Sequence, residues 1–128
     1  MRTVILAIVL SVVSGNAAAG WVAVSDTTKF ITFADPATIS KDGDTVKMWD
    51  LLDYKTIREV EGIRYMSQKS QSEYNCQKDL TRALVVHLHS GIMGSGEPVF
   101  NITMPDEWQH VAPGSVNEAL LKYACGKS

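Results

Sequence analysis

The segment 107–126 constrains the fold more than any other part of this 128-residue chain. Ser115 and Glu118 have the spacing of a capping box, in which the hydroxyl accepts from the backbone N–H of Glu118 and the carboxylate reaches back. Apolar residues then recur at helical spacing and predict one apolar stripe: Val116, Ala119, Leu120 and Tyr123. Such a short helix is not stable alone in water, so we expect it to pack on a larger element.

Residues 1–19 have the pattern of a secretory signal peptide. Arg2 precedes a largely apolar run at 4–13, and three alanines at 17–19 form a cleavage site, so we expect cleavage after Ala19. The alternative is a membrane anchor, but a span needs about 20 apolar residues and this run is about half as long. No cysteine lies near the cleavage site, so a lipid-anchored lipoprotein is not expected. The sequence predicts an exported protein, in the periplasm or at the outer cell surface.

The mature chain, residues 20–128, is long enough for one core and too short for two domains. Without Arg2 it carries eleven Lys and Arg against fourteen Asp and Glu, a net charge of about −3. These charges are interspersed, without the basic stripe that neutralises phosphates. Nucleic-acid binding is therefore not expected, and no second apolar segment is long enough for a membrane span after signal cleavage.

Cys76 and Cys125 are the only cysteines, and Cys125 lies at the end of the predicted helix. In an exported chain of this size, two cysteines most simply form one structural disulfide. Two buried free thiols are the alternative. The spacing is not that of a C-x-x-C pair, so a redox enzyme is not indicated.

Most of the remaining chain alternates apolar and polar residues with the period of β-strands. We expect about six strands, at residues 21–24, 29–34, 45–54, 63–74, 80–89 and 99–104. Six strands followed by one helix is an α+β pattern. The sequence predicts an antiparallel sheet with one C-terminal helix packed on one face, closed by one disulfide.

Several breaks in this pattern predict the connections. Pro36 lacks the ladder donor and restricts the residue before it, so Asp35-Pro36 is expected to end the second strand. Residues 38–40 are expected to form a short bridge, and the Asp42-Gly43 pair a hairpin turn. We expect residues 57–62 to form a charged loop, and Pro105-Asp106 to stop the last strand.

His87 and His89 are the most suggestive pair for metal binding. They lie two residues apart on a predicted strand and so share one face, a spacing that can hold one metal ion. A third ligand would have to come from His110 or a carboxylate such as Asp106, and nothing in the sequence places either nearby. The preferred interpretation is two polar side chains on a solvated strand face, without a metal or another cofactor.

No catalytic constellation stands out. The glycine-rich residues 91–96 lack the Gly-Lys-Ser/Thr ending of a phosphate-binding loop, and a wide hairpin loop explains them without a ligand. The chain has no Gly-x-Ser-x-Gly nucleophile motif. Asp50 and Asp53 are interpreted as solvated charges rather than as an acid–base pair. We therefore predict no catalytic residue and a protein that is not an enzyme.

Several short segments, in order along the chain, resemble the surface-adhesin protein E family. They are Trp21-Val22-Ala23-Val24, Leu52-Asp53-Tyr54-Lys55-Thr56, Tyr74-Asn75-Cys76, the loop 90–96, and Trp108 with the run from Val111 to Cys125. This resemblance covers residues 21–126. It implies an antiparallel sheet with the helix against its concave face, and a protein that binds host extracellular-matrix or serum proteins, with a homodimer as a further expectation.

Trp49 and Leu51 are the candidate partner-binding residues. The predicted strand 45–54 is apolar on both faces, with Val46, Met48, Leu52 and Tyr54 on one and Trp49 and Leu51 on the other. If the helix covers the first face, these two side chains point outward and form an adhesive surface. For the tryptophans as a group, burial in the core is the favoured interpretation and an interface is the alternative. A soluble periplasmic accessory or ligand-binding protein without an adhesive role is the alternative function.

Overall fold

The computed structural model describes residues 20–104 and 107–127; the expected signal peptide and the Pro105-Asp106 stop lie outside this part. Its elements are, in order, β1 (Val22–Asp26), β2 (Phe30–Asp42), β3 (Thr45–Val60), β4 (Ile63–Asn75), β5 (Leu80–His89), the 3-10 turn η2 (Ile92–Gly94), β6 (Pro98–Thr103), β7 (Gln109–His110) and α2 (Val116–Cys125). Strands β1 to β6 pair in sequence order, all antiparallel. The short β7 pairs with the first residues of β5, whose later residues pair with β6.

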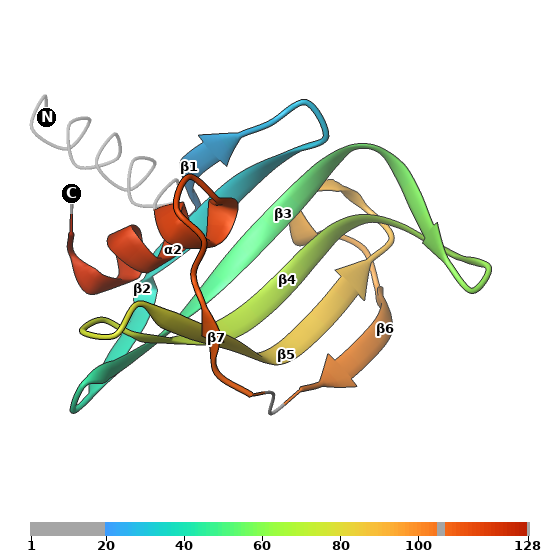
Figure 1. The fold of residues 1–128 in the computed structure, drawn as a ribbon. Helices are drawn as coiled ribbons and strands as arrows, with labels where there is room; N and C mark the ends of the chain where they lie inside the picture. The colour runs from blue at the N-terminus through green and yellow to red at the C-terminus, as the bar shows by residue number, and fades with distance from the viewer. Residues whose placement is uncertain (1–19, 105–106, 128) are drawn as a thin grey trace, which may run out of the picture.

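Helix α2 lies across one face of this sheet (Figure 1). Its buried side chains are Leu120, Leu121 and Ala124, which pack on a sheet surface that includes Met48 and Tyr74. The predicted α+β fold is confirmed. The predicted helix stripe is rotated slightly, because Ala119 and Tyr123 are only half-buried. No helix in the described part of the chain is long and apolar enough to cross a membrane.

Both ends of α2 are capped. Ser115 Oγ accepts from the Glu118 N–H at 3.2 Å, as the capping box predicts. The Glu118 carboxylate reaches one residue further back than expected, because it accepts from the Gly114 N–H at 2.9 Å. At the other end Gly126 adopts a left-handed conformation, φ 68°, which lets the chain close the last helical turn.

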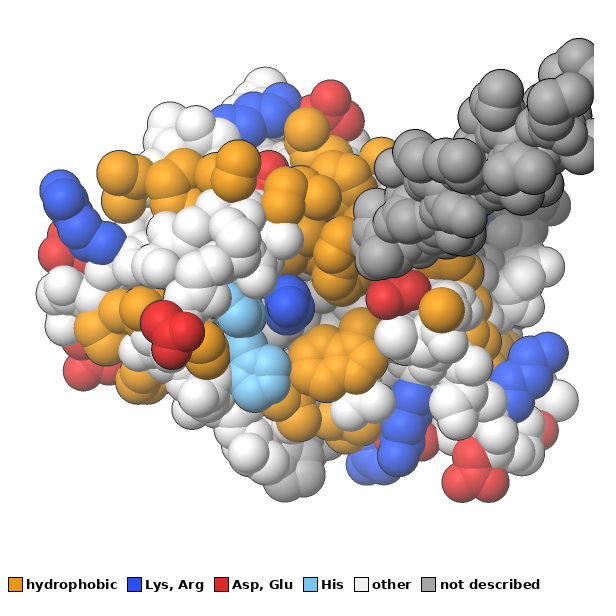
Figure 2. Space-filling view, turned by 180° about the vertical axis from the view of Figure 1, so that it is seen from behind, with side chains coloured by type: hydrophobic (Ala, Val, Ile, Leu, Met, Phe, Trp, Pro, Cys, Tyr) orange, Lys and Arg blue, Asp and Glu red, His pale blue; other side chains and the backbone are white. Residues whose placement is uncertain are grey.

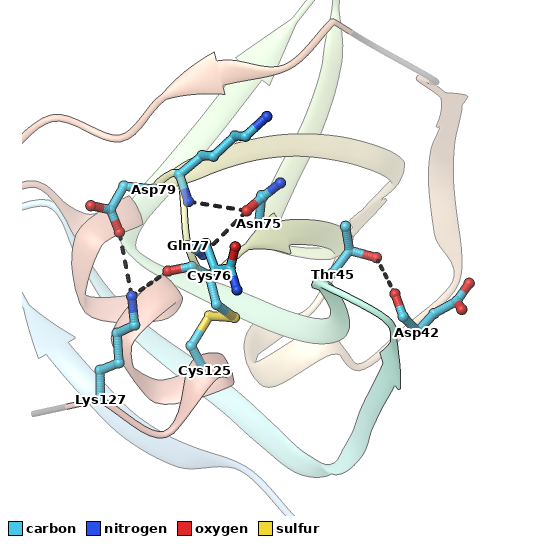
Figure 3. Close-up of a disulfide and its surroundings, with 9 residues drawn as sticks. Asp42, Thr45, Asn75, Cys76, Gln77, Asp79, Cys125 and Lys127 are labelled. Atoms are coloured by element: carbon cyan, nitrogen blue, oxygen red, sulfur yellow. Dashed lines mark hydrogen bonds and ion pairs between the residues drawn. A yellow bond between two sulfur atoms is a disulfide. The ribbon is translucent and has the colours of Figure 1, made fainter.

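The disulfide joins Cys76, just after β4, to Cys125 at the end of α2 (Figure 3). The two Cα atoms are 5.8 Å apart, and 49 residues separate the cysteines in sequence. Lys127, beyond the helix, donates to the Cys76 carbonyl and lies 3.7 Å from Asp79. The predicted disulfide is confirmed, and it fixes the end of α2 to the β4–β5 turn.

Strand β2 does not end at Pro36, contrary to the sequence prediction, and residues 38–40 are not a separate bridge. The pairing with β3 shifts between Asp35 and Ser40, so that Pro36 sits in a bulge where no ladder hydrogen bond is required of it. Thr38 closes this gap, since its hydroxyl donates to the Asp35 carbonyl and accepts from the Trp49 N–H at 2.9 Å. The strand therefore resumes and runs to the Asp42-Gly43 turn.

The predicted charged loop at 57–62 is also wrong. Strands β3 and β4 continue as a hairpin to Val60 and Ile63, and Glu61 and Gly62, both with positive φ, form its turn. Figure 1 shows this hairpin projecting beyond the neighbouring strands. The Arg58 guanidinium lies 5.2 Å from the Tyr54 ring centroid near the base of the hairpin. The charged residues Arg58 and Glu59 are extended because they pair with Tyr65 and Arg64 on β4. This segment lacks the apolar alternation from which a strand is predicted.

Candidate binding site on the outer sheet face

The face of the sheet opposite α2, here called the outer face, carries the predicted partner-binding residues. Val46 and Met48 belong to the core beneath α2. Side chains alternate along a strand, so Trp49 and Leu51 point to the other side. Trp49 is partly exposed there, whereas Leu51 is 0% exposed. The expectation that Leu51 forms outward adhesive surface is therefore wrong, and the partner-binding role of Trp49 stays a prediction.

The glycine-rich loop between β5 and β6 buries Leu51. This loop, residues 90–97 with η2 at its centre, folds back over β3 and β4 on the outer face (Figure 1). A Cβ built on Gly94 would lie 3.4 Å from a Leu51 methyl carbon and 2.4 Å from the Lys69 Cε atom. The loop thus needs glycine at this position both for contact with the sheet and for its φ of 71°.

Two sheet side chains hold the loop in place. Ser67 Oγ donates to the Gly91 carbonyl at 2.7 Å and accepts from the Gly94 N–H at 2.8 Å. Asp53 Oδ1 accepts from the Met93 N–H at 2.8 Å. These N–H groups therefore serve acceptors of the sheet itself. Asp53 is a half-buried loop anchor rather than the solvated charge expected from the sequence.

Beside the covered part of the outer face lies a hollow of about 410 Å³, here called the Trp49 hollow. Its lining comes from five strands and from the residue before β1: Trp21, Asp35, Thr38, Trp49, Lys69, His87, His89, Pro98 and Asn101. The hollow is mostly apolar. Figure 2 shows this face, on which histidine side chains lie next to hydrophobic ones and a basic side chain is set back between them.

The indole of Trp49 stacks on the imidazole of His87, with planes 10° apart and ring centroids at 5.7 Å. His87 Nδ1 and Asn101 Oδ1 are 2.5 Å apart, so the imidazole is fixed from the β6 side. Lys69 on β4 lies beside this ring pair, because it pairs with His87 on one side and with Leu51, two residues from Trp49, on the other. Opposite charges, from Lys69 and Asp35, line the hollow together with flat aromatic surface.

The two histidines share one face, as their spacing predicts, but not in the surroundings that were expected. His89 is only 7% exposed, and its Nδ1 lies 3.2 Å from the Gly96 carbonyl, so it is not a solvated side chain. His110, the candidate third metal ligand, pairs with Leu80 at the opposite end of β5. Asp106 lies outside the described residues. Among residues 20–104 and 107–127, no three His, Cys, Asp or Glu side chains are grouped as metal ligands.

Sequence reasoning missed Trp21, Asp35 and Lys69 as neighbours of Trp49. They line the same hollow as Trp49 although they come from different parts of the chain, and Asp35 pairs directly with Trp49 across β2 and β3. A sequence signal was nevertheless available, since the alternation that placed Trp49 outward also applies to residues of β4 and β5. The missing information was which residue lies opposite which.

Comparison with known proteins identifies the chain by family and by fold. The family model described as "Surface-adhesin protein E" matches residues 21–126. Crystal form II of Haemophilus influenzae protein E superposes with a TM-score of 0.65, at 11% identity over 84% of this chain and 87% of that one. A second structure of Haemophilus influenzae protein E gives 0.63, again at 11% identity, over 84% of both chains. At this identity the structural likeness concerns the fold alone. No curated protein sequence matches the chain.

Proposed function

The chain belongs to the surface-adhesin protein E family, and on this basis we propose that it is an exported, non-enzymatic domain that binds a host extracellular-matrix or serum protein. The Trp49 hollow is the binding site of this proposal. Family membership is what supports the cell-surface location and the class of partner in this proposal. The aromatic, apolar and charged side chains of the hollow are the groups that would contact the partner.

One observation carries the choice of site: an aromatic side chain that is partly exposed yet held rigidly. Trp49 is fixed through its backbone N–H by Thr38 and through its ring by His87. A preorganised, partly exposed tryptophan is a typical energetic centre of a protein interface, because its large ring loses water without first losing conformational freedom. The hollow is large enough for one side chain of a partner to insert next to that ring.

The charged groups at the hollow give the partner orientation. Lys69 and Asp35 lie at opposite sides of Trp49, on β4 and β2. A partner side chain on the indole can therefore place a carboxylate toward Lys69 or a cation toward Asp35. The hairpin tip at 41–44 extends beyond the sheet and provides a polar rim to a larger contact.

The test is binding to a panel of purified extracellular-matrix and serum proteins, immobilised and probed with the mature protein. Trp49→Ala should weaken binding by about 2 kcal/mol or more, the range of an interface centre. Ile57→Ala is the matched comparison, because Ile57 is 55% exposed on the projecting hairpin and its truncation also removes exposed apolar surface. If Ile57→Ala abolishes binding while a folded Trp49→Ala protein binds normally, the hairpin binds and the Trp49 hollow does not.

A soluble periplasmic ligand-binding protein is the second candidate, and a cleft beneath α2, described below, favours it. Protease treatment of intact cells separates the two, with a periplasmic protein as the negative control. An adhesin is cleaved on intact cells, whereas a periplasmic protein is cleaved only after the outer membrane is breached.

Sedimentation of the purified protein, with and without Trp49→Ala, tests whether the same face forms the homodimer that the family resemblance implies.

A further inference from the structure

The second large hollow of the molecule lies on the other side of the sheet, next to the first turn of α2. This α2 cleft has a volume of about 620 Å³, within the range of small-molecule sites. The helix packs on core residues of β2, β3 and β4. The cleft therefore opens between Leu120 on the helix and Val86 and Ile102 on β5 and β6. Phe30, Leu52 and Met104 complete its apolar walls.

Asp50 lies at the floor of the α2 cleft. It occupies β3 between Ala34 on β2 and Ser70 on β4, and it is only 3% exposed. The sequence signal for it was an acidic residue interrupting the apolar face of β3. No hydrogen bond from the described residues contributes to the pKa of the Asp50 carboxyl, which burial alone raises. Burial of a polar group without a partner is costly, so such a group in a cleft points to a partner that comes from outside.

A second buried polar atom lies beside Asp50. Thr32 pairs with Leu52 and therefore sits on the same face, one position diagonal to Asp50. It is fully buried, and its Oγ1 has no hydrogen-bond partner in the described part of the chain. The unpartnered Thr32 hydroxyl and the buried Asp50 carboxyl thus lie next to each other on the sheet. Of the two residues, Asp50 is the one that lines the cleft.

The charges around Asp50 define which ligand fits. Asp50 is the only acidic or basic side chain that lines the cleft among the described residues. The titratable groups that interact with it are Tyr54 on its own strand and Tyr74 on β4, both neutral phenols with raised pKa values because of burial. The residues of α2 that line the cleft, and its N-cap Ser115, carry no charge.

Burial also raises the pKa of Asp50 to about 8. At neutral pH the empty cleft therefore holds a protonated carboxyl. A cation next to Asp50 would favour the carboxylate, and the proton would pass to the solvent. The positive end of the α2 dipole could also favour the Asp50 carboxylate. The negative charge nearest to that helix end is already supplied by Glu118, whose carboxylate accepts from the Gly114 N–H.

We propose that the α2 cleft binds a small organic cation, an amine whose apolar body packs on the cleft walls and whose ammonium group pairs with Asp50. The Ser70 hydroxyl and the Gln68 side chain line the same floor. Ser70 Oγ accepts from Gln68 Nε2 and Gln68 Oε1 accepts from the Tyr54 hydroxyl, both at 3.3 Å, and each oxygen retains a second lone pair for an ammonium group. This site lies on the opposite sheet face from the Trp49 hollow and is independent of the proposed adhesive function. Either can fail without the other.

Three indole probes of nearly equal shape test the proposal: tryptamine as the cation, indole-3-ethanol as the neutral analogue and indole-3-acetate as the anion. Calorimetry at about pH 6.5 should show tryptamine binding about tenfold more tightly than indole-3-ethanol, with indole-3-acetate weakest. Repeating the titration in buffers of different ionisation enthalpy should show release of about one proton per tryptamine bound. Equal affinities, no proton release, or no tryptamine binding at millimolar concentration would overturn the proposal.

Variants locate the site. Asp50→Asn keeps the shape of the neutral side chain and should abolish both the preference for tryptamine and the proton release. Asp44→Asn makes the same charge change on the exposed β2–β3 turn and should alter neither. Trp49→Ala should also leave tryptamine binding unchanged; its loss in that variant would place the probe in the Trp49 hollow and contradict the α2 cleft. The probe comparison on the wild-type protein stands even if Asp50→Asn fails to fold.

Discussion

Trp49 and His87 stack with their ring planes 10° apart although a whole strand, β4, separates the strands that carry them. Lys69 on that intervening strand pairs with His87, and Gln71, two residues on, pairs with Trp49. Three strands thus meet in one aromatic and basic surface on the face that α2 leaves uncovered. This arrangement fixes Trp49 before any partner arrives, which is the physical basis of the proposed binding site.

The stacking should be measurable as a coupling energy. Trp49→Ala and His87→Ala, alone and together, form a double-mutant cycle in urea unfolding. We expect a coupling of about 0.5–1.5 kcal/mol, the range for aromatic pairs. Strictly additive effects of the two substitutions would show that the rings are neighbours without mutual stabilisation, and the rigidity argued for Trp49 would then be unsupported.

Loss of the disulfide should destabilise the protein strongly. The Cys76–Cys125 bond closes a loop of about 50 residues, for which the chain-entropy relation gives about 4 kcal/mol. The double variant Cys76→Ser, Cys125→Ser should lower the free energy of unfolding by that order, and reducing agent should have no further effect on it. Wild-type protein whose stability is unchanged by reduction would contradict the role assigned to the bond.

Ser67→Ala should release the loop over Leu51. The Ser67 hydroxyl is fully buried and serves both the Gly91 carbonyl and the Gly94 N–H. Its removal leaves these two backbone groups without their partner, at a cost of about 1–3 kcal/mol. Hydrogen exchange of the Gly94 amide should accelerate in the variant, while amides in α2 keep their rates. Ser90→Ala, in the same loop, provides the comparison.

Stability should depend on pH through Asp50. Its folded-state pKa of about 8 lies above the ordinary value of 3.8, so the folded protein holds a proton that the unfolded chain loses as pH rises from 4 to 8. The wild-type protein should therefore lose stability across that window, by up to about 5 kcal/mol at about 1.36 kcal/mol per pKa unit.

The Asp50→Asn variant isolates this contribution, because the amide cannot ionise. Its unfolding free energy should be close to that of the wild type near pH 4 and exceed it increasingly up to pH 8, above which the difference stays constant. Urea unfolding at several pH values measures both curves. Parallel curves from pH 4 to pH 9 would mean that Asp50 is ionised in the folded protein, contrary to its burial.

The features that the sequence predicted well are local ones. The cap at Ser115, the helix after it and the Asp42-Gly43 turn depend on residues within one turn of each other. The position of Trp49 on the face opposite the helix follows from the period of a strand. The disulfide could be predicted without structural information, since the chain has only two cysteines.

The errors have a common physical cause: contacts between residues far apart in the sequence. Pro36 was predicted to end β2 because the hydrogen bond that lets the strand continue past it joins Thr38 to the Trp49 N–H, eleven residues away. Leu51 appeared exposed because the loop that buries it is held by Asp53, forty residues before Met93. Asp50 appeared solvated because its surroundings are set by the docking of α2. None of these contacts leaves a local pattern.

The central claim, that the Trp49 hollow is an adhesive surface, is tested most directly by whole-cell adherence to surfaces coated with matrix or serum proteins. Cells carrying the wild-type protein, Trp49→Ala or Ile57→Ala would be compared at equal amounts of folded protein. The account predicts that adherence falls with Trp49→Ala and persists with Ile57→Ala. Undiminished adherence of the Trp49→Ala cells would contradict it.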